Sequence, residues 1–158
     1  MSILKHVKII GIGKYLPEQT ITSEELEKKL GLPNGWSLKF SGVKERRHVV
    51  DETNADLAVH ALKQAIKNAN INISDIDLLI SSAATFDYIL PYQAAYILKS
   101  LKQSNIEIPS MDINSSCLSF VSAFEVATSL LDGIKYKRIA IVSSEVSSKG
   151  LNPDHKES

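Results

Sequence analysis

Cysteine is nearly absent from this 158-residue chain, and the single residue Cys117 excludes an intrachain disulfide framework and a CxxC metal knuckle. An excess of one charge is absent too, because 18 lysines and arginines balance 18 aspartates and glutamates. The chain therefore has no net positive charge that would attract nucleic acid or an anionic membrane. No apolar run approaches the ~18 residues of a membrane span, and no signal-peptide pattern precedes Gly11. We expect a cytoplasmic protein that binds neither nucleic acid nor membrane.

The common cofactor and metal motifs are missing as well. Gly11 and Gly13 invite comparison with the G-x-G-x-x-G fingerprint, but its third glycine would fall at Leu16, which Pro17 follows. No G-x-S-x-G elbow, Walker loop or HExxH motif occurs. The histidines are not spaced as a ligand set; they are His6, His48, His60 and His155. We expect no metal site and no tightly bound cofactor.

A globular core is nevertheless expected, because 44% of the residues are hydrophobic and 23% are charged. Apolar runs predict strands at residues 7–12, 76–82, 111–113 and 138–143. Capping patterns predict a short helix from Thr22 to Gly31 and an amphipathic helix over residues 53–69. Two more helices are predicted, one entered at Pro91 and one over residues 118–131, whereas residues 32–50 and the tail look irregular.

Alternating strands and helices predict an α/β fold, with a mainly parallel, mixed sheet and helices on its faces. The helix over residues 118–131 contains one charged residue, Glu125, so we expect it to be buried on most of its surface. The chain stops soon after its last predicted strand, which suggests truncation.

Cys117 lies between the third predicted strand and the N-terminus of this buried helix. Backbone N–H groups and the positive end of the helix dipole would stabilise a thiolate there, which is how a cysteine nucleophile is activated. A small cysteine in the apolar core is the alternative, and position alone leaves it open.

Short stretches of the chain follow one another in the order and spacing of one family's motifs. In the first part they are Tyr15-Leu16-Pro17, Thr20-Ile21-Thr22, Glu24-Glu25-Leu26, Trp36, Ser41-Gly42-Val43, Glu45-Arg46-Arg47, Glu52-Thr53 and Asp56-Leu57-Ala58. Further on they are Asp75 to Ile80, Pro91, and Asp112 to Phe120 around Cys117. Through these stretches the chain resembles the β-ketoacyl-acyl-carrier-protein synthase III family of the thiolase superfamily, from about Val7 to its end.

The resemblance implies that residues 1–158 form the N-terminal half of a thiolase-like condensing enzyme that acts as a homodimer. It implies that Cys117 accepts an acyl group from a CoA or carrier-protein (phosphopantetheine) thioester. A decarboxylative Claisen condensation with malonyl-carrier protein would follow, in fatty-acid or related biosynthesis. The family's histidine and asparagine belong to the second half, so we expect this chain alone to be acylated but not to condense.

The resemblance also implies substrate-binding residues. Trp36 would be the plate on which a CoA adenine stacks, Leu90 would reach the partner's acyl pocket, and Lys156 would weakly replace a phosphate-facing arginine. A basic cluster, comprising Lys44, Arg46 and Arg47, would meet a phosphopantetheine phosphate or an acidic carrier protein. Ordinary alternatives remain open: a tryptophan capping a loop, a leucine in the core and a solvated basic loop.

Two departures from the family pattern widen the possible functions. Phe40, beside Lys39, stands where the family has an arginine, which favours carrier-protein over CoA donors. Ser119 stands where the family has a glycine two residues after the nucleophile, which alters the first helical turn. A secondary-metabolite or non-decarboxylative condensing enzyme therefore stays open. From a different class, a non-catalytic partner that uses the fold to dimerise stays open too.

Overall fold

The computed structural model describes residues 6–102 and 107–152, and the chain divides into two compact units. The first, here called the sheet unit, comprises Met1–Tyr15 and Thr53–Glu145. The second, the hairpin unit, comprises Leu16–Glu52 and Val146–Ser158. Among the described residues, no helix has both the length and the apolarity that crossing a bilayer requires.

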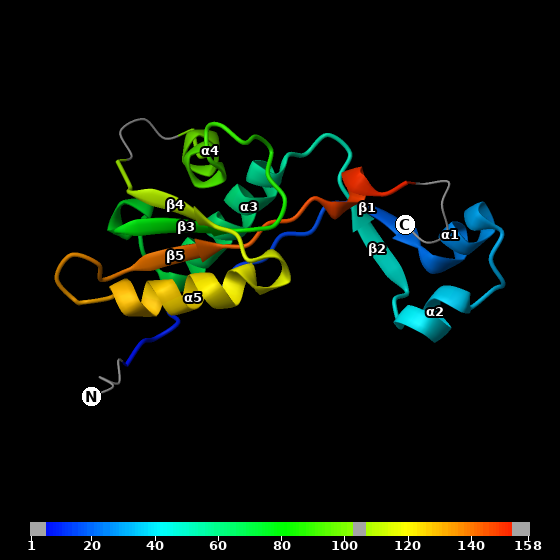
Figure 1. Cartoon of the computed structure of the whole chain (residues 1–158), viewed down its shortest axis with the longest axis horizontal. Helices are drawn as coiled ribbons and strands as arrows, with labels where there is room; N and C mark the ends of the chain where they lie inside the picture. The colour runs from blue at the N-terminus through cyan, green and yellow to red at the C-terminus, as the bar shows by residue number, and fades with distance from the viewer. Residues whose placement is uncertain (1–5, 103–106, 153–158) are drawn as a thin grey trace. The chain divides into compact units, whose positions relative to one another are not determined.

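A three-stranded parallel sheet forms the centre of the sheet unit (Figure 1). β3 (Leu78–Ser82) lies between β4 (Ser110–Ile113) and β5 (Ile139–Val142) and pairs in parallel with both. Every residue of β3 is buried, as a central strand covered on both faces requires. The strands predicted at residues 76–82, 111–113 and 138–143 are confirmed, and so is the parallel α/β architecture.

Helices cover both faces of this sheet (Figure 1). α3 (Asn54–Ala69) and α4 (Gln93–Ser100) share one core cluster with Leu79 of β3. α5 (Ser119–Leu130) packs on the opposite face, where Leu78 and Ile80 form a second cluster with Ala123 and Ala127 of the helix. Side chains of a strand alternate between faces, so one strand supplies both cores.

Local capping explains where the long helix α3 begins. Thr53 Oγ1 accepts the N–H of Asp56 at 3.1 Å, and Asp56 Oδ2 accepts the N–H of Thr53 at 3.0 Å, which is the predicted capping box. The predicted helix entry at Pro91 is displaced, because Tyr92 is the N-cap of α4 and Pro91 precedes it. Two short 3₁₀ turns also belong to this unit, η1 (Ile73–Asp75) and η2 (Ser116–Leu118).

The strand predicted at residues 7–12 is wrong. This segment forms no ladder with the described strands, and four of its apolar side chains are exposed, namely Val7, Ile9, Ile10 and Ile12. Its backbone lies instead against α3. The two are so close that a Cβ on Gly13 would collide with the Ala61 carbonyl oxygen and the Ala65 nitrogen. Lys14 N donates to the Gln64 side chain of α3 at 2.6 Å. The two glycines thus permit close packing on a helix and do not mark a turn after a strand.

Residues 32–50 of the hairpin unit were predicted to be irregular, but they contain a helix at Trp36–Ser41 and a strand at Glu45–His48. β1 (Gln19–Thr22) pairs antiparallel with β2 (Glu45–His48), and α1 (Ser23–Leu30) precedes α2 (Trp36–Ser41). α1 begins at the predicted Thr22 capping box and ends at Gly31, whose φ is 64°. A last turn, η3 (Ser147–Gly150), also belongs to this unit.

The overlooked elements depend on partners distant in sequence. The Glu27 carboxylate of α1 accepts the N–H groups of Gly35, at 2.9 Å, and Ser37, at 2.6 Å, and so caps the start of α2. β2 is polar throughout, so no apolar alternation announces it, and its ladder exists only because β1 lies beside it.

Candidate functional site

Cys117 lies in η2, between the end of β4 and the start of α5, and its side chain is exposed. The predicted position at the N-terminus of a helix is therefore confirmed, and in the described structure Cys117 is not a buried core residue. Residues 114–119, here called the Cys117 loop, connect the strand to the helix. The sulfur is accessible to a reagent or substrate from solvent.

The backbone of the Cys117 loop is unusual at Ser116. Its φ of 52° lies in the left-handed region, which a residue with a side chain adopts at a cost of about 1–2 kcal/mol. Such residues cluster at functional sites, because the surrounding structure must hold them in place. The strained residue here is the immediate neighbour of Cys117, so it determines the direction in which the chain enters α5.

Side-chain hydrogen bonds hold this turn. Ser119 Oγ accepts the N–H of Ser115 at 2.9 Å and donates to the carbonyl oxygen of Ser116 at 2.7 Å. Asn114 Oδ1 accepts the N–H of Ser116 at 2.9 Å. Ser119 is only 3% exposed, so water cannot readily replace its bonds. The serine that departs from the family pattern is therefore a structural part of the Cys117 loop.

Carboxylates fix the helix starts at the carboxyl end of the sheet. Asp112, in the strand that leads to the Cys117 loop, accepts the first two N–H groups of α4 at 2.7 Å each. Asp87 accepts the first two N–H groups of α3 at 2.8 Å each. A carboxylate at a helix N-terminus satisfies unpaired donors and opposes the positive end of the helix dipole. Asp112 therefore fixes α4 against β4, the strand from which the Cys117 loop emerges.

A polar network, buried at Asn54 and Ser144 but exposed at Glu145, joins the ends of β3 and β5 to the same helices. Asn54, 2% exposed, donates through Nδ2 to the carbonyl oxygens of Ser144 and Thr85 at 2.8 and 2.9 Å. Glu145 accepts the N–H groups of Ala84 and Thr85 at 2.6 and 3.0 Å. The sequence analysis missed this network, since its members lie 31 to 90 positions apart and no spacing links them.

Leu90 lies in the loop between β3 and α4 and is 83% exposed. Within the described structure it is therefore not part of the core. Its neighbour Ile89 is exposed to an even greater extent. Two adjacent, exposed aliphatic side chains on an anchored loop are free to contact another surface.

α5 is less buried than predicted. Only Ser119, Ala123 and Ala127 are buried, while four apolar residues of the helix are exposed, namely Phe120, Val121, Phe124 and Val126, and so is the N-cap Leu118. The reason is that one sheet alone packs against this helix in the described structure. The low charge of the helix, which predicted burial all round, instead produces a large exposed apolar face.

Trp36 opens α2 in the hairpin unit and is 38% exposed. Its ring lies 4.9 Å from that of Phe40, centroid to centroid, with a tilt of 42°. Lys39 Nζ lies 5.3 Å from the centroid of the Phe40 ring. Phe40, which stands where the family has an arginine, is thus an exposed aromatic neighbour of Trp36. The nearby positive charge comes from Lys39.

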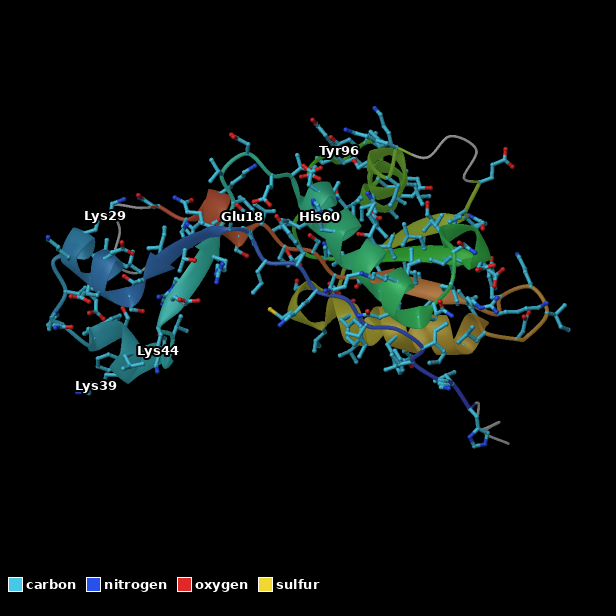
Figure 2. The ribbon with its side chains drawn as sticks, turned by 180° about the vertical axis from the view of Figure 1, so that it is seen from behind. Glu18, Lys29, Lys39, Lys44, His60 and Tyr96 are labelled. Atoms are coloured by element: carbon cyan, nitrogen blue, oxygen red, sulfur yellow. The ribbon has the colours of Figure 1, made fainter. Side chains whose placement is uncertain are left out.

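The basic cluster lies on and beside β2, not on an irregular loop. Lys44 is exposed and precedes the strand, at the same end of the unit as Lys39 (Figure 2). Arg46 donates to Ser23 Oγ at 3.1 Å, and Arg47 donates to the Pro17 carbonyl oxygen at 3.3 Å. Both arginines therefore have partners within the hairpin unit. Lys156, the remaining predicted binding residue, lies outside the described residues.

The carboxyl of Glu27 is an ionisable group that hydrogen bonds hold near Trp36. Its pKa lies below the ordinary value, chiefly because the Ser37 backbone N–H donates to the carboxylate, with a further donation from Gly35. The charged form is thus the one that caps α2 and orients the helix bearing Trp36. Within residues 6–102 and 107–152, no group of three or more histidine, cysteine, aspartate or glutamate side chains could hold a metal ion.

Comparison with known proteins gives one consistent result. Residues 111–158 match the family model of 3-oxoacyl-[acyl-carrier-protein] synthase III. The chain is 34% identical over 148 residues to β-ketoacyl-[acyl-carrier-protein] synthase III of Vesicomyosocius okutanii, which covers 94% of this chain and 46% of the relative. The corresponding protein of Fusobacterium nucleatum is 35% identical over 147 residues, covering 92% of this chain and 44% of the relative.

Solved structures agree with these relatives. The crystal structure of 3-oxoacyl-[acyl-carrier-protein] synthase III from Aquifex aeolicus superposes with a TM-score of 0.87 at 30% identity, covering 96% of this chain and 48% of that one. A variant of Xanthomonas campestris OleA gives 0.79 at 26% identity, covering 89% and 43%. The chain spans about half the length of the curated relatives that it matches.

Proposed function

Since this chain belongs to the 3-oxoacyl-[acyl-carrier-protein] synthase III family, we propose that it carries the acyl-accepting half of a condensing enzyme, with Cys117 as the acceptor. One observation carries the proposal. Cys117 is exposed at the start of α5, next to a left-handed residue that side-chain bonds hold in place. A thiol in this position lies next to the helix N-terminus along the chain and is exposed to a thioester in solution.

The first step is acyl transfer. The thiolate of Cys117 attacks the carbonyl carbon of an acyl thioester, the bond from that carbon to the donor sulfur breaks, and the donor leaves as a thiolate that takes up a proton from solvent. The product is a thioester on Cys117. The positive end of the α5 dipole stabilises the attacking thiolate, so this step requires no neighbouring base in the resting protein.

The second step would be decarboxylative condensation in the complete enzyme. Malonyl-carrier protein loses carbon dioxide, and the resulting enolate carbon attacks the acyl carbon on Cys117. The carbon–sulfur bond then breaks, which gives the 3-oxoacyl product and returns the thiolate. The groups that stabilise the enolate and the oxyanion are assigned to the second half of the fold. The process served would be fatty-acid or related biosynthesis.

The exposed apolar face of α5 supports the proposal of a missing second half. Phe120 and Val121 are 52% and 61% exposed, whereas apolar side chains of that size usually lie inside. The curated relatives are about twice as long as this chain, which leaves room for a second sheet on that face. The exposed Leu90 would, in the same way, meet a second copy in a homodimer.

The donor is a CoA or carrier-protein thioester, and the hairpin unit favours the carrier protein. Phe40 replaces a guanidinium that would stack on CoA, while Lys39 and Lys44 remain available to an acidic carrier surface. Arg46 and Arg47 already have hydrogen-bond partners within the unit, so we expect them to contribute less than the lysines to binding of the carrier protein. Trp36 keeps an exposed ring surface on which the donor could stack.

Mass spectrometry tests the acyl transfer directly. The chain is incubated with acyl-CoA and, separately, with acyl-carrier protein, and the tryptic peptide that contains Cys117 is examined for the added acyl mass. We expect an adduct on Cys117, and none on a Cys117→Ser variant at the same pH. If neither donor gives an adduct, the proposed acyl transfer is wrong, and a non-catalytic dimerisation module becomes the favoured function. An adduct from the carrier protein alone would identify the donor.

A second candidate function is a non-decarboxylative or secondary-metabolite condensing enzyme of the same superfamily. The two departures from the family pattern, Phe40 and Ser119, favour it, because they alter the donor surface and the first turn of α5. In the full-length enzyme, release of labelled carbon dioxide from a malonyl-carrier substrate during product formation separates decarboxylative condensation from the non-decarboxylative branch of this candidate. Product without carbon dioxide would favour the second candidate.

A further inference from the structure

The Cys117 loop contains a residue in a conformation that its own side chain disfavours. Ser116 has a φ of 52°, although glycine is the residue that adopts this region freely. Nothing in Ser116 itself selects this conformation. The bonds to its neighbours must therefore keep the loop in place, and the structure identifies which atoms make them.

Ser119 provides the only hydroxyl that binds the described loop on both sides of the turn. Its Oγ accepts the N–H of Ser115, the residue before the strained one, at 2.9 Å. The same hydroxyl donates to the carbonyl oxygen of Ser116 at 2.7 Å. The side chain is buried, at 3% exposure, and belongs to the first turn of α5. Ser119 thus joins the turn to the helix on which it rests.

We propose that Ser119 is a positioning residue, which holds Ser116 in the left-handed conformation and thereby keeps Cys117 at the N-terminus of α5. This inference rests on the proposed function, in which Cys117 is the acceptor. Ser119 touches no substrate and acts only through the backbone of residues 115–117. The family pattern has a glycine at this position, which has no hydroxyl, so a protein with that glycine lacks these two hydrogen bonds.

The mechanism makes a specific prediction about thiol reactivity. Without the Ser119 hydroxyl, Ser116 relaxes toward a negative φ, and Cys117 leaves the positive end of the helix dipole. The thiolate is then less stabilised and reacts more slowly with an electrophile. Replacing Ser116 by glycine removes the cost of the left-handed conformation, so that the loop no longer depends on Ser119.

The experiment measures the second-order rate constant for alkylation of Cys117 by iodoacetamide at neutral pH, in the chain as it exists. We expect Ser119→Ala to lower the rate about tenfold, the population change that the cost of a left-handed residue implies. In the double variant Ser119→Ala with Ser116→Gly, we expect the rate to return to within about twofold of the wild type. Ser122→Ala, the same substitution further along α5, is the matched control and should leave the rate unchanged.

Several outcomes would overturn the proposal. One is an alkylation rate for Ser119→Ala equal to that of the wild type. Another is a folded double variant that stays as slow as Ser119→Ala, since the loss would then not act through Ser116. If Ser119→Ala does not fold, the comparison is made in the Ser116→Gly background. There, removal of the hydroxyl must change the rate by no more than about twofold, and a larger loss overturns the idea.

These outcomes are distinct from failure of the proposed function, because iodoacetamide requires no thioester and no second half. A wild-type chain that is never acylated, but whose alkylation follows the pattern above, would contradict the acyl-transfer function and retain Ser119 as the residue that positions the thiol. An acylated chain whose alkylation rate is the same with and without the Ser119 hydroxyl would support acyl transfer and contradict the positioning role of Ser119.

Discussion

Two residues without side chains, Gly11 and Gly13, determine how closely the N-terminal segment approaches α3. A Cβ at Gly13 would meet backbone atoms of Ala61 and Ala65, and one at Gly11 would meet atoms of Ala65 and Ala69. Backbone atoms of a helix cannot swing aside as the end of a long side chain can. The small alanines on α3 and the glycines opposite them therefore form one matched contact.

Gly13→Ala should destabilise the sheet unit for this reason. We expect a loss of about 1–3 kcal/mol in the free energy of unfolding, the range observed when a packed site receives an extra methyl group. Chemical denaturation followed by far-ultraviolet circular dichroism measures the change. Gly150→Ala is the control, because a Cβ at Gly150 meets nothing within 4 Å. Equal stability of the two variants would show that the segment does not pack on α3 in solution.

Glu27 gives the hairpin unit a pH dependence whose sign can be worked out. Hydrogen bonds from Ser37 and Gly35 lower the pKa of this carboxyl in the folded chain below the ordinary value of 4.5. Its contribution to stability is therefore fully present above pH 4.5 and is lost as the pH falls through the lower, folded pKa. Glu27→Gln should remove this part of the acid sensitivity and lower stability at neutral pH.

The fluorescence of Trp36, the single tryptophan of the chain, reports the unfolding of this unit. Urea midpoints are compared between about pH 7 and about pH 3. The gap between the wild type and Glu27→Gln should narrow at the acid end. Glu24→Gln, which neutralises an exposed carboxyl of the same helix, serves as the control. A gap that stays constant across the pH range would contradict the role of the charged carboxylate as the cap of α2.

At the scale of elements, the sequence predicted what is encoded locally. The capping boxes at Thr22 and Thr53, the helices that follow them and the central strand β3 all depend on residues within a few positions of one another. α2 and β2 were overlooked because their supports, Glu27 and β1, are distant in sequence. The segment 7–12 has the composition of a strand but pairs with no described strand.

The candidate site also contains some features that the sequence predicted and others that it could not predict. A pattern of residues was sufficient to locate Cys117 at a helix start. The left-handed conformation of Ser116 could not be predicted, since serine carries no signature for positive φ, whereas glycine or asparagine would have. Ser119 stood out as a departure from the family, but its hydrogen bonds to Ser115 and Ser116 needed coordinates. Asp87 gave no signal, because the helix it caps precedes it in the chain.

Removal of the α3 cap tests the strongest of these local signals. Thr53→Ala deletes the hydroxyl that accepts the N–H of Asp56 and should lower the stability of the sheet unit by about 1 kcal/mol. Thr53→Ser keeps the oxygen and should recover most of that loss. Denaturation midpoints measured by circular dichroism decide the matter. A Thr53→Ser variant as unstable as Thr53→Ala would place the contribution of Thr53 in its methyl group.

At the scale of the whole molecule, the candidate residues belong to different units. Cys117 and Leu90 lie in the sheet unit, whereas Trp36 and the basic cluster lie in the hairpin unit. Under the proposed function, substitutions could therefore disrupt acyl acceptance and donor recognition separately. Phe40→Arg would restore the family's residue and, under the proposed function, should raise acylation from CoA donors without changing the alkylation of Cys117.

The exposed face of α5 has a further consequence for the chain on its own. Its apolar residues Phe120, Val121, Phe124 and Val126 are between 36% and 61% exposed, although water is a poor environment for a continuous patch of this kind. The chain must either bury this face against other molecules or tolerate its exposure. Under the proposed function the second half of the fold would cover the face, so the chain alone should associate with itself.

Val121→Lys tests this expectation by placing a charge in the middle of the face without touching the core, since Val121 is 61% exposed. Sedimentation velocity over a range of concentrations should show the wild type shifting to larger species and Val121→Lys remaining monomeric to higher concentration. Ser129→Lys adds the same charge to the same helix without removing apolar surface, so it should resemble the wild type more closely. A wild type that stays a compact monomer throughout would mean that the face needs no cover, and the proposal of a missing half would lose its structural support.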